Sequence, residues 1–353
     1  MKIQELRKTL AGGLVIPAHP LALTAQRKLD ERRQRGLSRY YLDAGAGGLA
    51  VGVHTTQFAI RSPSHGLYRP VLALAAEEAD AFQKRTDRRI VKVAGAIGPT
   101  AQALAEAEAA AGLGYDAVLL GLGWAKGRSW DELANHCEEV SKVLPLFGFY
   151  LQPAAGGILL PYGFWRKFLE IDNIAAIKVA PFNRYHTIDV ARALAESGRA
   201  DEVSLYTGND DAIVMDLLTP YTYEVGGTRI EMRFRGGLLG HWAVWTRRVV
   251  ELVERIGAIA RSGSPVPPDI LRIAVEVTDA NAAFFDAANG FAGSIAGIHE
   301  VLVRQGLMAG RWCLDPAEDL SPGQAQQIDR VARAYPPLCD DEFVSANRDR
   351  WLA

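Results

Sequence analysis

The sequence has few cysteines and no long apolar run. Cys137, Cys313 and Cys339 are far apart among 353 residues and form no CxxC pair. This spacing argues against a structural zinc site and favours a reducing compartment. No segment approaches the ~20 apolar residues of a membrane span, and residues 1–10 are charged, without the apolar core of a signal peptide. We therefore expect a cytoplasmic protein that does not bind a membrane.

The sequence also lacks an excess of charge and the usual cofactor motifs. The sequence has 39 Lys and Arg against 41 Asp and Glu. This balance gives no excess of positive charge to attract nucleic acid. The glycines at 45–48 precede a predicted strand, the reverse of the dinucleotide fingerprint. No HExxH motif or clustered ligand spacing indicates a metal, and we expect neither metal nor cofactor. A metal-dependent hydrolase stays open as an alternative because three histidines lie at predicted strand ends: His19, His54 and His241.

Short apolar runs alternate with longer amphipathic ones over most of the chain. They predict strands at 13–18, 49–53, 90–94, 117–120, 146–151, 174–181, 203–206 and 237–240. The intervening segments predict helices at 24–44, 70–84, 99–111, 129–143, 162–169, 187–197, 210–218 and 241–260. Eight strand–helix units in about 250 residues match a (β/α)8 barrel in number and length. A doubly wound sheet would use fewer strands.

Two parts of the chain depart from this alternation. Gly226-Gly227 separates two β-rich runs, which predicts a β-hairpin insertion at about 221–235, before the last barrel strand. Residues 263–268 have the composition of a linker, and the rest predicts helices near 267–275, 280–304 and 323–334 without strands. We therefore expect a barrel catalytic domain at 1–262 and a C-terminal helical region at 263–353.

One predicted strand carries a single charged residue. In the run 174–181, Lys178 lies near the C-terminal end among apolar neighbours, and the active site of a barrel lies at that end of its strands. Desolvation would lower the lysine pKa from its usual value of about 10.4, and only the neutral amine attacks a carbonyl. A lysine that extends to the barrel rim or pairs with a carboxylate is the alternative.

Other polar residues follow neighbouring predicted strands. Tyr150 lies near the end of the strand before Lys178, and Thr55 and Thr56 follow the second strand. This set suits imine chemistry, in which an amine forms a Schiff base, a phenol moves protons, and hydroxyl groups hold a carboxylate. A tyrosine that satisfies a backbone group, or threonines that cap the next segment, would explain the same residues without catalysis.

The order of short motifs resembles the dihydrodipicolinate synthase and N-acetylneuraminate lyase family. These motifs are Val15-Ile16-Pro17, Val53-His54-Thr55-Thr56, Phe149-Tyr150-Leu151-Gln152-Pro153, Ala176-Ile177-Lys178 and Thr207-Gly208-Asn209-Asp210. The resemblance covers residues 13–310 and implies a class I, Schiff-base-forming aldolase or lyase on a (β/α)8 barrel with a helical C-terminal region. It also implies a homo-oligomer, a dimer or a tetramer.

The resemblance implies a role for each matching residue. Lys178 resembles the imine-forming lysine, Tyr150 the proton relay, and Thr55 with Thr56 the pair that binds the 2-oxo acid's carboxylate. Gly208 begins a turn that resembles the family's Gly-Asp-Asp turn, with Asn209 in place of its first Asp. Further substrate-binding candidates are His54 beside the threonines, Leu239 in the last strand next to the imine, and Trp124 as a pocket wall.

The departures from the family pattern limit which substrates we expect. The Gly-Thr-Thr-Gly-Glu loop of the family here has the sequence His54-Thr55-Thr56-Gln57-Phe58. The synthases carry an arginine where this chain has Ala154-Ala155-Gly156-Gly157, and their second tyrosine falls near Trp124-Ala125. Dihydrodipicolinate synthase activity is therefore not expected.

The sequence predicts an aldolase or lyase that acts on pyruvate or another 2-oxo acid and on an aldehyde, which we expect to be neutral or apolar. Two alternatives stay open. One is a non-catalytic barrel that binds a small acid, and the other is the metal-dependent hydrolase.

Overall fold

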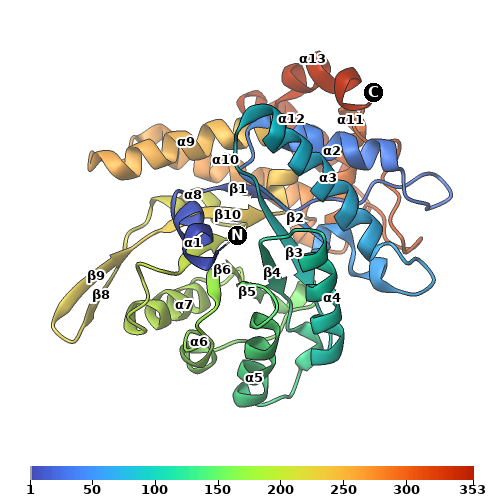
Figure 1. Ribbon diagram of the computed structural model, residues 1–353. Helices are drawn as coiled ribbons and strands as arrows, with labels where there is room; N and C mark the ends of the chain where they lie inside the picture. The colour runs from blue at the N-terminus through green and yellow to red at the C-terminus, as the bar shows by residue number, and fades with distance from the viewer. Residues whose placement is uncertain (1) are drawn as a thin grey trace. The chain divides into compact units, whose positions relative to one another are not determined.

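A computed structural model describes residues 2–353, and its main sheet has eight strands (Figure 1). Their order in the sheet is β1-β10-β7-β6-β5-β4-β3-β2, and a parallel bridge between Ala18 and Ala50 joins the two ends. The strands are β1 (Val15–Pro17), β2 (Gly48–Val51), β3 (Val91–Ala96), β4 (Ala117–Leu120), β5 (Leu146–Leu151), β6 (Ile174–Ala180), β7 (Ser204–Thr207) and β10 (Phe234–Leu239). The predicted (β/α)8 barrel is confirmed.

Helices connect successive strands and follow the last one. Those within the barrel are α2 (Glu31–Ala44), α3 (Tyr68–Thr86), α4 (Thr100–Gly112), α5 (Trp130–Ser141), α6 (Tyr162–Phe168), α7 (Arg184–Glu196), α8 (Ile213–Leu218) and α9 (Thr246–Ser262). The C-terminal helices are α10 (Pro268–Phe284), α11 (Ser294–Arg304), α12 (Gln324–Ala334) and α13 (Asp341–Trp351). Among residues 2–353, no helix combines the length and the apolar character that crossing a bilayer requires.

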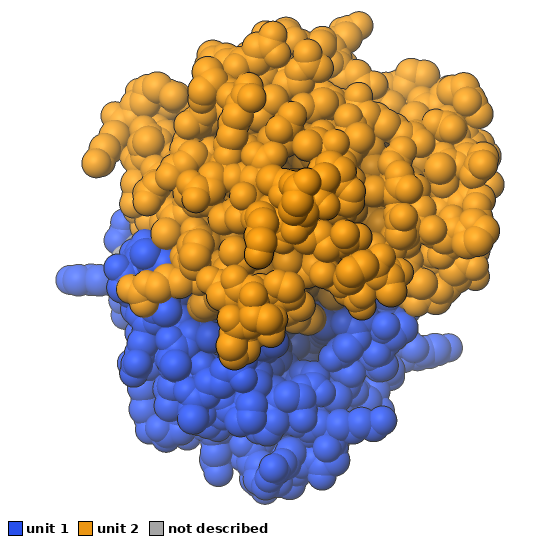
Figure 2. All heavy atoms as spheres, turned by 90° about the vertical axis from the view of Figure 1, so that its right-hand side faces the viewer, with its two compact units in different colours: residues 1–14, 93–238 blue, residues 15–92, 239–353 orange. Residues whose placement is uncertain are grey.

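The chain divides into two compact units, drawn in different colours in Figure 2. Unit 1 comprises residues 1–14 and 93–238, and unit 2 comprises residues 15–92 and 239–353. Neither unit ends at the predicted boundary between residues 262 and 263, so that boundary stays a prediction.

The predicted hairpin is confirmed in unit 1. Strands β8 (Tyr221–Val225) and β9 (Thr228–Met232) pair antiparallel, with Val225 opposite Thr228. The turn residues Gly226 and Gly227 have φ values of 57° and 79°, which a two-residue hairpin turn of this kind requires and glycine adopts without strain.

Two helix predictions differ from the structure, and two helices were not predicted. The helix predicted at 24–44 begins only at Glu31, where Asp30 caps it by accepting a hydrogen bond from the Arg33 amide. The helix predicted at 280–304 is interrupted: its first residues end α10, its last residues form α11, and Asp286 and Phe291 between the two helices have positive φ. Helices α1 (Ile3–Ala11) and α13 were not predicted.

Helix α1 lies at the N-terminal end of β6 in unit 1. The Arg7 side chain donates hydrogen bonds to the Asp172 and Ile174 carbonyl groups, at 2.6 and 3.0 Å. The hydroxyl of Tyr206, on β7, donates to the Leu10 carbonyl at 2.7 Å and accepts from the Leu14 amide at 3.2 Å. One buried phenol therefore ties the first helix to the sheet.

Tyr206→Phe should lower the free energy of unfolding by about 1–3 kcal/mol, because it leaves the Leu14 amide and the Leu10 carbonyl without their partner. Tyr185→Phe is the control, since Tyr185 is 81% exposed and should change stability by less than about 0.5 kcal/mol. Urea denaturation of both variants measures the difference, and equal midpoints would contradict this role of Tyr206.

Candidate active site

Lys178 lies on the inner face of the sheet, opposite the helices. It is in register with Phe149 of β5 and Tyr206 of β7, so these three side chains share one face. The adjacent Ile177 faces the other way, since a side chain at Gly148 would meet both Ile177 and Phe168 of α6. Lys178 is only 8% exposed, and its amine lies 4.5 Å from the centre of the Phe149 ring.

The burial of this amine changes its protonation. Desolvation lowers the pKa of Lys178 to about 8, although the negative charge of Asp210 raises it in opposition. About a tenth of the amine is therefore neutral at pH 7, where an ordinary lysine with a pKa of about 10.4 has almost no neutral form. Asp210 does not cap the next helix, because α8 begins after Ala212 without a side-chain cap.

Gly208 lies directly against the lysine side chain. A Cβ atom at this position would lie 2.6 Å from Lys178 Cε and 2.7 Å from Ala180 Cβ, closer than van der Waals contact allows. The chain needs glycine here to admit the lysine, and the structure therefore brings the predicted Gly208 and Lys178 together.

A buried carboxylate holds the turn that follows Gly208. Asp216 of α8 is fully buried and accepts hydrogen bonds from the Thr207 hydroxyl at 2.6 Å and from the Asn209 amide group at 2.9 Å. Arg184 forms an ion pair with Asp216 and donates to the Tyr221 hydroxyl at 3.0 Å. Sequence reasoning missed Asp216, Arg184 and Tyr221 because they come from three separate elements without a shared motif.

Tyr150 faces away from Lys178. It lies opposite Val179 in the sheet, one position beyond the lysine's neighbour Phe149. Its fully buried ring packs against Trp165 of α6 and stacks on His186 of α7, and its hydroxyl accepts a hydrogen bond from the Leu160 amide at 3.3 Å. The structure does not bring the two predicted catalytic residues together, so the relay role of Tyr150 stays a prediction that this geometry does not support.

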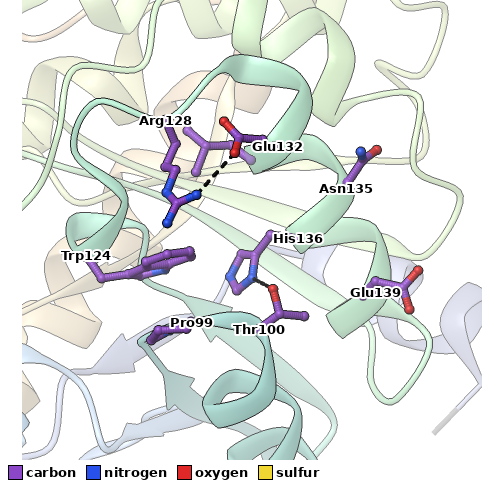
Figure 3. A pocket seen from close by; sticks show the side chains of 9 residues that line it. Pro99, Thr100, Trp124, Arg128, Glu132, Asn135, His136 and Glu139 are labelled. Carbon is purple, nitrogen blue, oxygen red and sulfur yellow. Dashed lines mark hydrogen bonds and ion pairs between the residues drawn. The ribbon is translucent and has the colours of Figure 1, made fainter.

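Trp124 lies in a 3-10 turn (Gly123–Ala125) after β4 and lines a cavity between α4 and α5 (Figure 3). Neither Lys178 nor Tyr150 lines that cavity. The assignment of Trp124 to the substrate pocket therefore stays a prediction.

The remaining predicted substrate-binding residues belong to unit 2. The Thr55 hydroxyl donates to the Ala18 carbonyl at 2.7 Å, and the Thr56 hydroxyl donates to the His19 carbonyl at 2.7 Å. The Ala18 amide donates to the Leu239 carbonyl at 3.0 Å, so unit 2 gathers both threonines and Leu239 around one segment. Both hydroxyl protons are used inside the protein, and carboxylate binding by the threonines stays a prediction.

The three histidines of the hydrolase alternative are also in unit 2. His19 is fully buried, with one ring nitrogen 2.8 Å from the Pro20 carbonyl and the other 2.9 Å from the Ser38 hydroxyl. His54 packs edge-on against Phe58, and His241 stacks on Phe284. Within residues 2–353, no three His, Cys, Asp or Glu side chains are grouped so that they could hold a metal. The hydrolase alternative thus has no ligand set in the described part of the chain.

Asp210→Asn should shift imine formation to lower pH. Removing this charge takes away the interaction that raises the pKa of Lys178, so the amine becomes neutral at a lower pH. The test is the rate of reductive trapping with pyruvate between about pH 6 and pH 10. Asp211→Asn is the matched control and should leave the midpoint unchanged. A midpoint that stays in place or rises in Asp210→Asn would contradict the assignment.

For a 2-oxo acid that reductive trapping has identified as a substrate, Tyr150→Phe should slow turnover by less than about tenfold. The reason is that the Tyr150 phenol faces α6 and α7 instead of the Lys178 amine. Steady-state kinetics with the wild-type protein as reference measures the effect. A loss of about 10²-fold or more would show that the phenol does relay protons.

Comparisons with known proteins agree with this fold. No protein-family model matches the chain, and no curated protein matches its sequence. Solved structures do match. Dihydrodipicolinate synthase from Cyanidioschyzon merolae with lysine bound has a TM-score of 0.73 at 20% identity, covering 93% of this chain and 99% of that one.

Two further structures give the same result. A prophage protein of the dihydrodipicolinic acid synthase family from E. coli K12, in complex with pyruvate, has a TM-score of 0.73 at 18% identity, covering 91% of this chain and 98% of that one. N-acetylneuraminate lyase from Mycoplasma synoviae has a TM-score of 0.68 at 16% identity, covering 92% and 98%. The chain therefore has the (β/α)8 fold of the dihydrodipicolinate synthase and N-acetylneuraminate lyase structures.

Proposed function

We propose that this protein is a Schiff-base-forming aldolase or lyase that acts on pyruvate or another 2-oxo acid. The observation that carries the proposal is Lys178, a buried amine with a pKa of about 8 on the inner face of the sheet. It lies near the C-terminal end of β6, where barrel enzymes have their active sites. A structural neighbour was solved in complex with pyruvate, which supports this class of substrate.

The proposed step uses the lysine as a nucleophile. The neutral amine adds to the keto carbon of the 2-oxo acid to give a carbinolamine. The carbinolamine hydroxyl takes up a proton from solvent and leaves as water, which gives an iminium ion. In cleavage, the bond between C3 and C4 of the acid breaks, and its electron pair moves to the iminium, which becomes an enamine. In synthesis, loss of a C3 proton converts the iminium to the enamine, and C3 then attacks the aldehyde carbon. The carboxylate that acts electrostatically on the amine is Asp210, which is a better candidate for proton transfer than Tyr150.

The proposed class of the second substrate follows from the absence of an arginine after β5. The turn after β5 contains Ala154, Ala155 and Gly156, and no arginine there could pair with a carboxylate. A charged aldehyde would lose its hydration without a bidentate partner, so the proposal includes a neutral acceptor aldehyde. Carboxylate binding of the 2-oxo acid by Thr55 and Thr56, a homo-oligomeric state and a cytoplasmic location belong to the same proposal.

A non-catalytic barrel that binds a small acid is the second candidate. Phe149, whose ring centre lies 4.5 Å from the amine, cannot move a proton. The loop after β2 also lacks the glycines and the glutamate of the related sequences. This candidate predicts binding of a 2-oxo acid without a covalent adduct.

The test is borohydride reduction in the presence of a panel of 2-oxo acids, followed by peptide mass mapping. We expect an adduct on the Lys178 peptide and none in Lys178→Ala. Lys92 is an internal control, because it is also buried but pairs with Asp80 at 2.6 Å, and its peptide should stay unmodified. Binding of an acid without any Lys178 adduct would support the second candidate and contradict the first.

A further inference from the structure

The amine of Lys178 lies over the face of an aromatic ring in unit 1. Its Nζ atom is 4.5 Å from the centre of the Phe149 ring, and the two residues are only 8% and 5% exposed. A lysine ammonium within about 6 Å of a ring centre is attracted by the negative charge density on the ring face. This attraction is stronger in a desolvated site than at an exposed one, and both groups of this pair are buried.

The sheet holds the pair in place from both sides of β6. This strand lies between β5 and β7. On the β5 side, Phe149 is in register with Lys178, so the two side chains share one face. On the β7 side, a Cβ atom at Gly208 would lie 2.6 Å from Lys178 Cε. The β7 side therefore leaves room for the lysine side chain, and the β5 side supplies the ring.

Two titratable groups also belong to the elements beside the lysine. Asp210, in the turn after β7, raises the pKa of the Lys178 amine through its negative charge. Tyr206 of β7 is in register with Lys178, but burial raises the pKa of its hydroxyl, which donates a hydrogen bond to the Leu10 carbonyl at 2.7 Å. Tyr206 is therefore neutral, while Asp210 and the ring of Phe149 both favour a positive charge on the amine.

The proposed reaction places a positive charge on the same nitrogen twice. Overall, the Lys178 ammonium and the keto group give the iminium and one water molecule, without net uptake or release of a proton. The carbinolamine and the enamine between the charged states are neutral. A ring over Nζ therefore favours the two cationic states, and a phenyl ring does so without a proton of its own to exchange.

We propose that Phe149 is a cation-binding group of this site. The face of its ring stabilises the positive charge of the Lys178 ammonium in the free protein and the charge of the iminium during the reaction. The iminium half of this inference rests on the proposed function, and the ammonium half does not. The role depends on the electron density of the ring face, so an electron-poor ring of similar size does not replace it.

Fluorinated phenylalanines in place of Phe149 test the ring face at nearly constant size. Each fluorine withdraws electron density, so one, two and three fluorines weaken the attraction stepwise. Carbon-13 nuclear magnetic resonance of the free protein follows the Lys178 titration. We expect its midpoint to fall with each fluorine, by about one pH unit in total, since a desolvated contact of this kind contributes about tenfold or more. A midpoint that stays in place across the series would overturn the proposal.

The same substitutions at Phe147 are the matched control. Phe147 lies two positions earlier on β5 and on the same face. It is fully buried and packs edge-to-face against Tyr206, with ring centres 5.3 Å apart. Fluorination there alters the core to a similar extent, and we expect the Lys178 midpoint to stay in place. An equal fall in both series would show that packing, and not the ring face beside the amine, sets the midpoint.

The iminium half has a separate readout in the affinity for a 2-oxo acid, measured from the concentration dependence of reductive trapping. Above the midpoint the neutral amine gains the ring contact when the iminium forms, whereas below it the ammonium already has that contact. Three fluorines on Phe149 should therefore weaken adduct formation about tenfold near pH 10 and leave it unchanged near pH 6.

Two results would contradict the role of Phe149 toward the iminium. One is equal weakening at both pH values, which would indicate a steric effect. The other is the absence of an adduct with every 2-oxo acid, which overturns the proposed function as well. The titration of the free protein needs no substrate, so it decides the role of Phe149 toward the ammonium in either case.

Discussion

The desolvation of one amine governs the chemistry expected of unit 1. Lys178 is held among apolar residues of β6, and its pKa falls to about 8 while Asp210 opposes the shift. The unfolded chain keeps a lysine pKa of about 10.4, so this group makes stability rise with pH between about 8 and 10.4. Below that window the folded protein carries a buried positive charge. Burying this charge is unfavourable, and the same burial lowers the pKa of the amine at the position where we propose that it acts as a nucleophile.

The surroundings of the amine depend on residues far from it in sequence. Gly208 leaves the space that the lysine side chain fills. The turn after Gly208 is held by Asp216, which accepts from Thr207 and Asn209 and pairs with Arg184. The inserted hairpin adds to this network through the Tyr221 hydroxyl, which lies 3.4 Å from Asp216. The hairpin thus has a structural role in unit 1, because its first residue covers a buried carboxylate.

The sequence predicted the barrel and the strand that contains Lys178 well, because both depend on local patterns. Apolar runs bounded by glycine and proline mark buried strands, and Gly226-Gly227 marks a hairpin. The face on which Tyr150 lies could not be predicted in this way. A shift of one residue between β5 and β6 reverses the face of every side chain, and the register places Phe149 beside the lysine. The Asp216 network and the break between α10 and α11 depend on tertiary contacts and positive φ angles that no local pattern shows.

The most direct test of this account is the titration of the Lys178 amine itself. Carbon-13 labelling of the lysine side chains, with Lys178→Arg to assign the signal, reports the protonation of each amine by nuclear magnetic resonance. The account predicts a midpoint at about pH 8 for Lys178. A midpoint above about pH 10, as in an ordinary lysine, would contradict it.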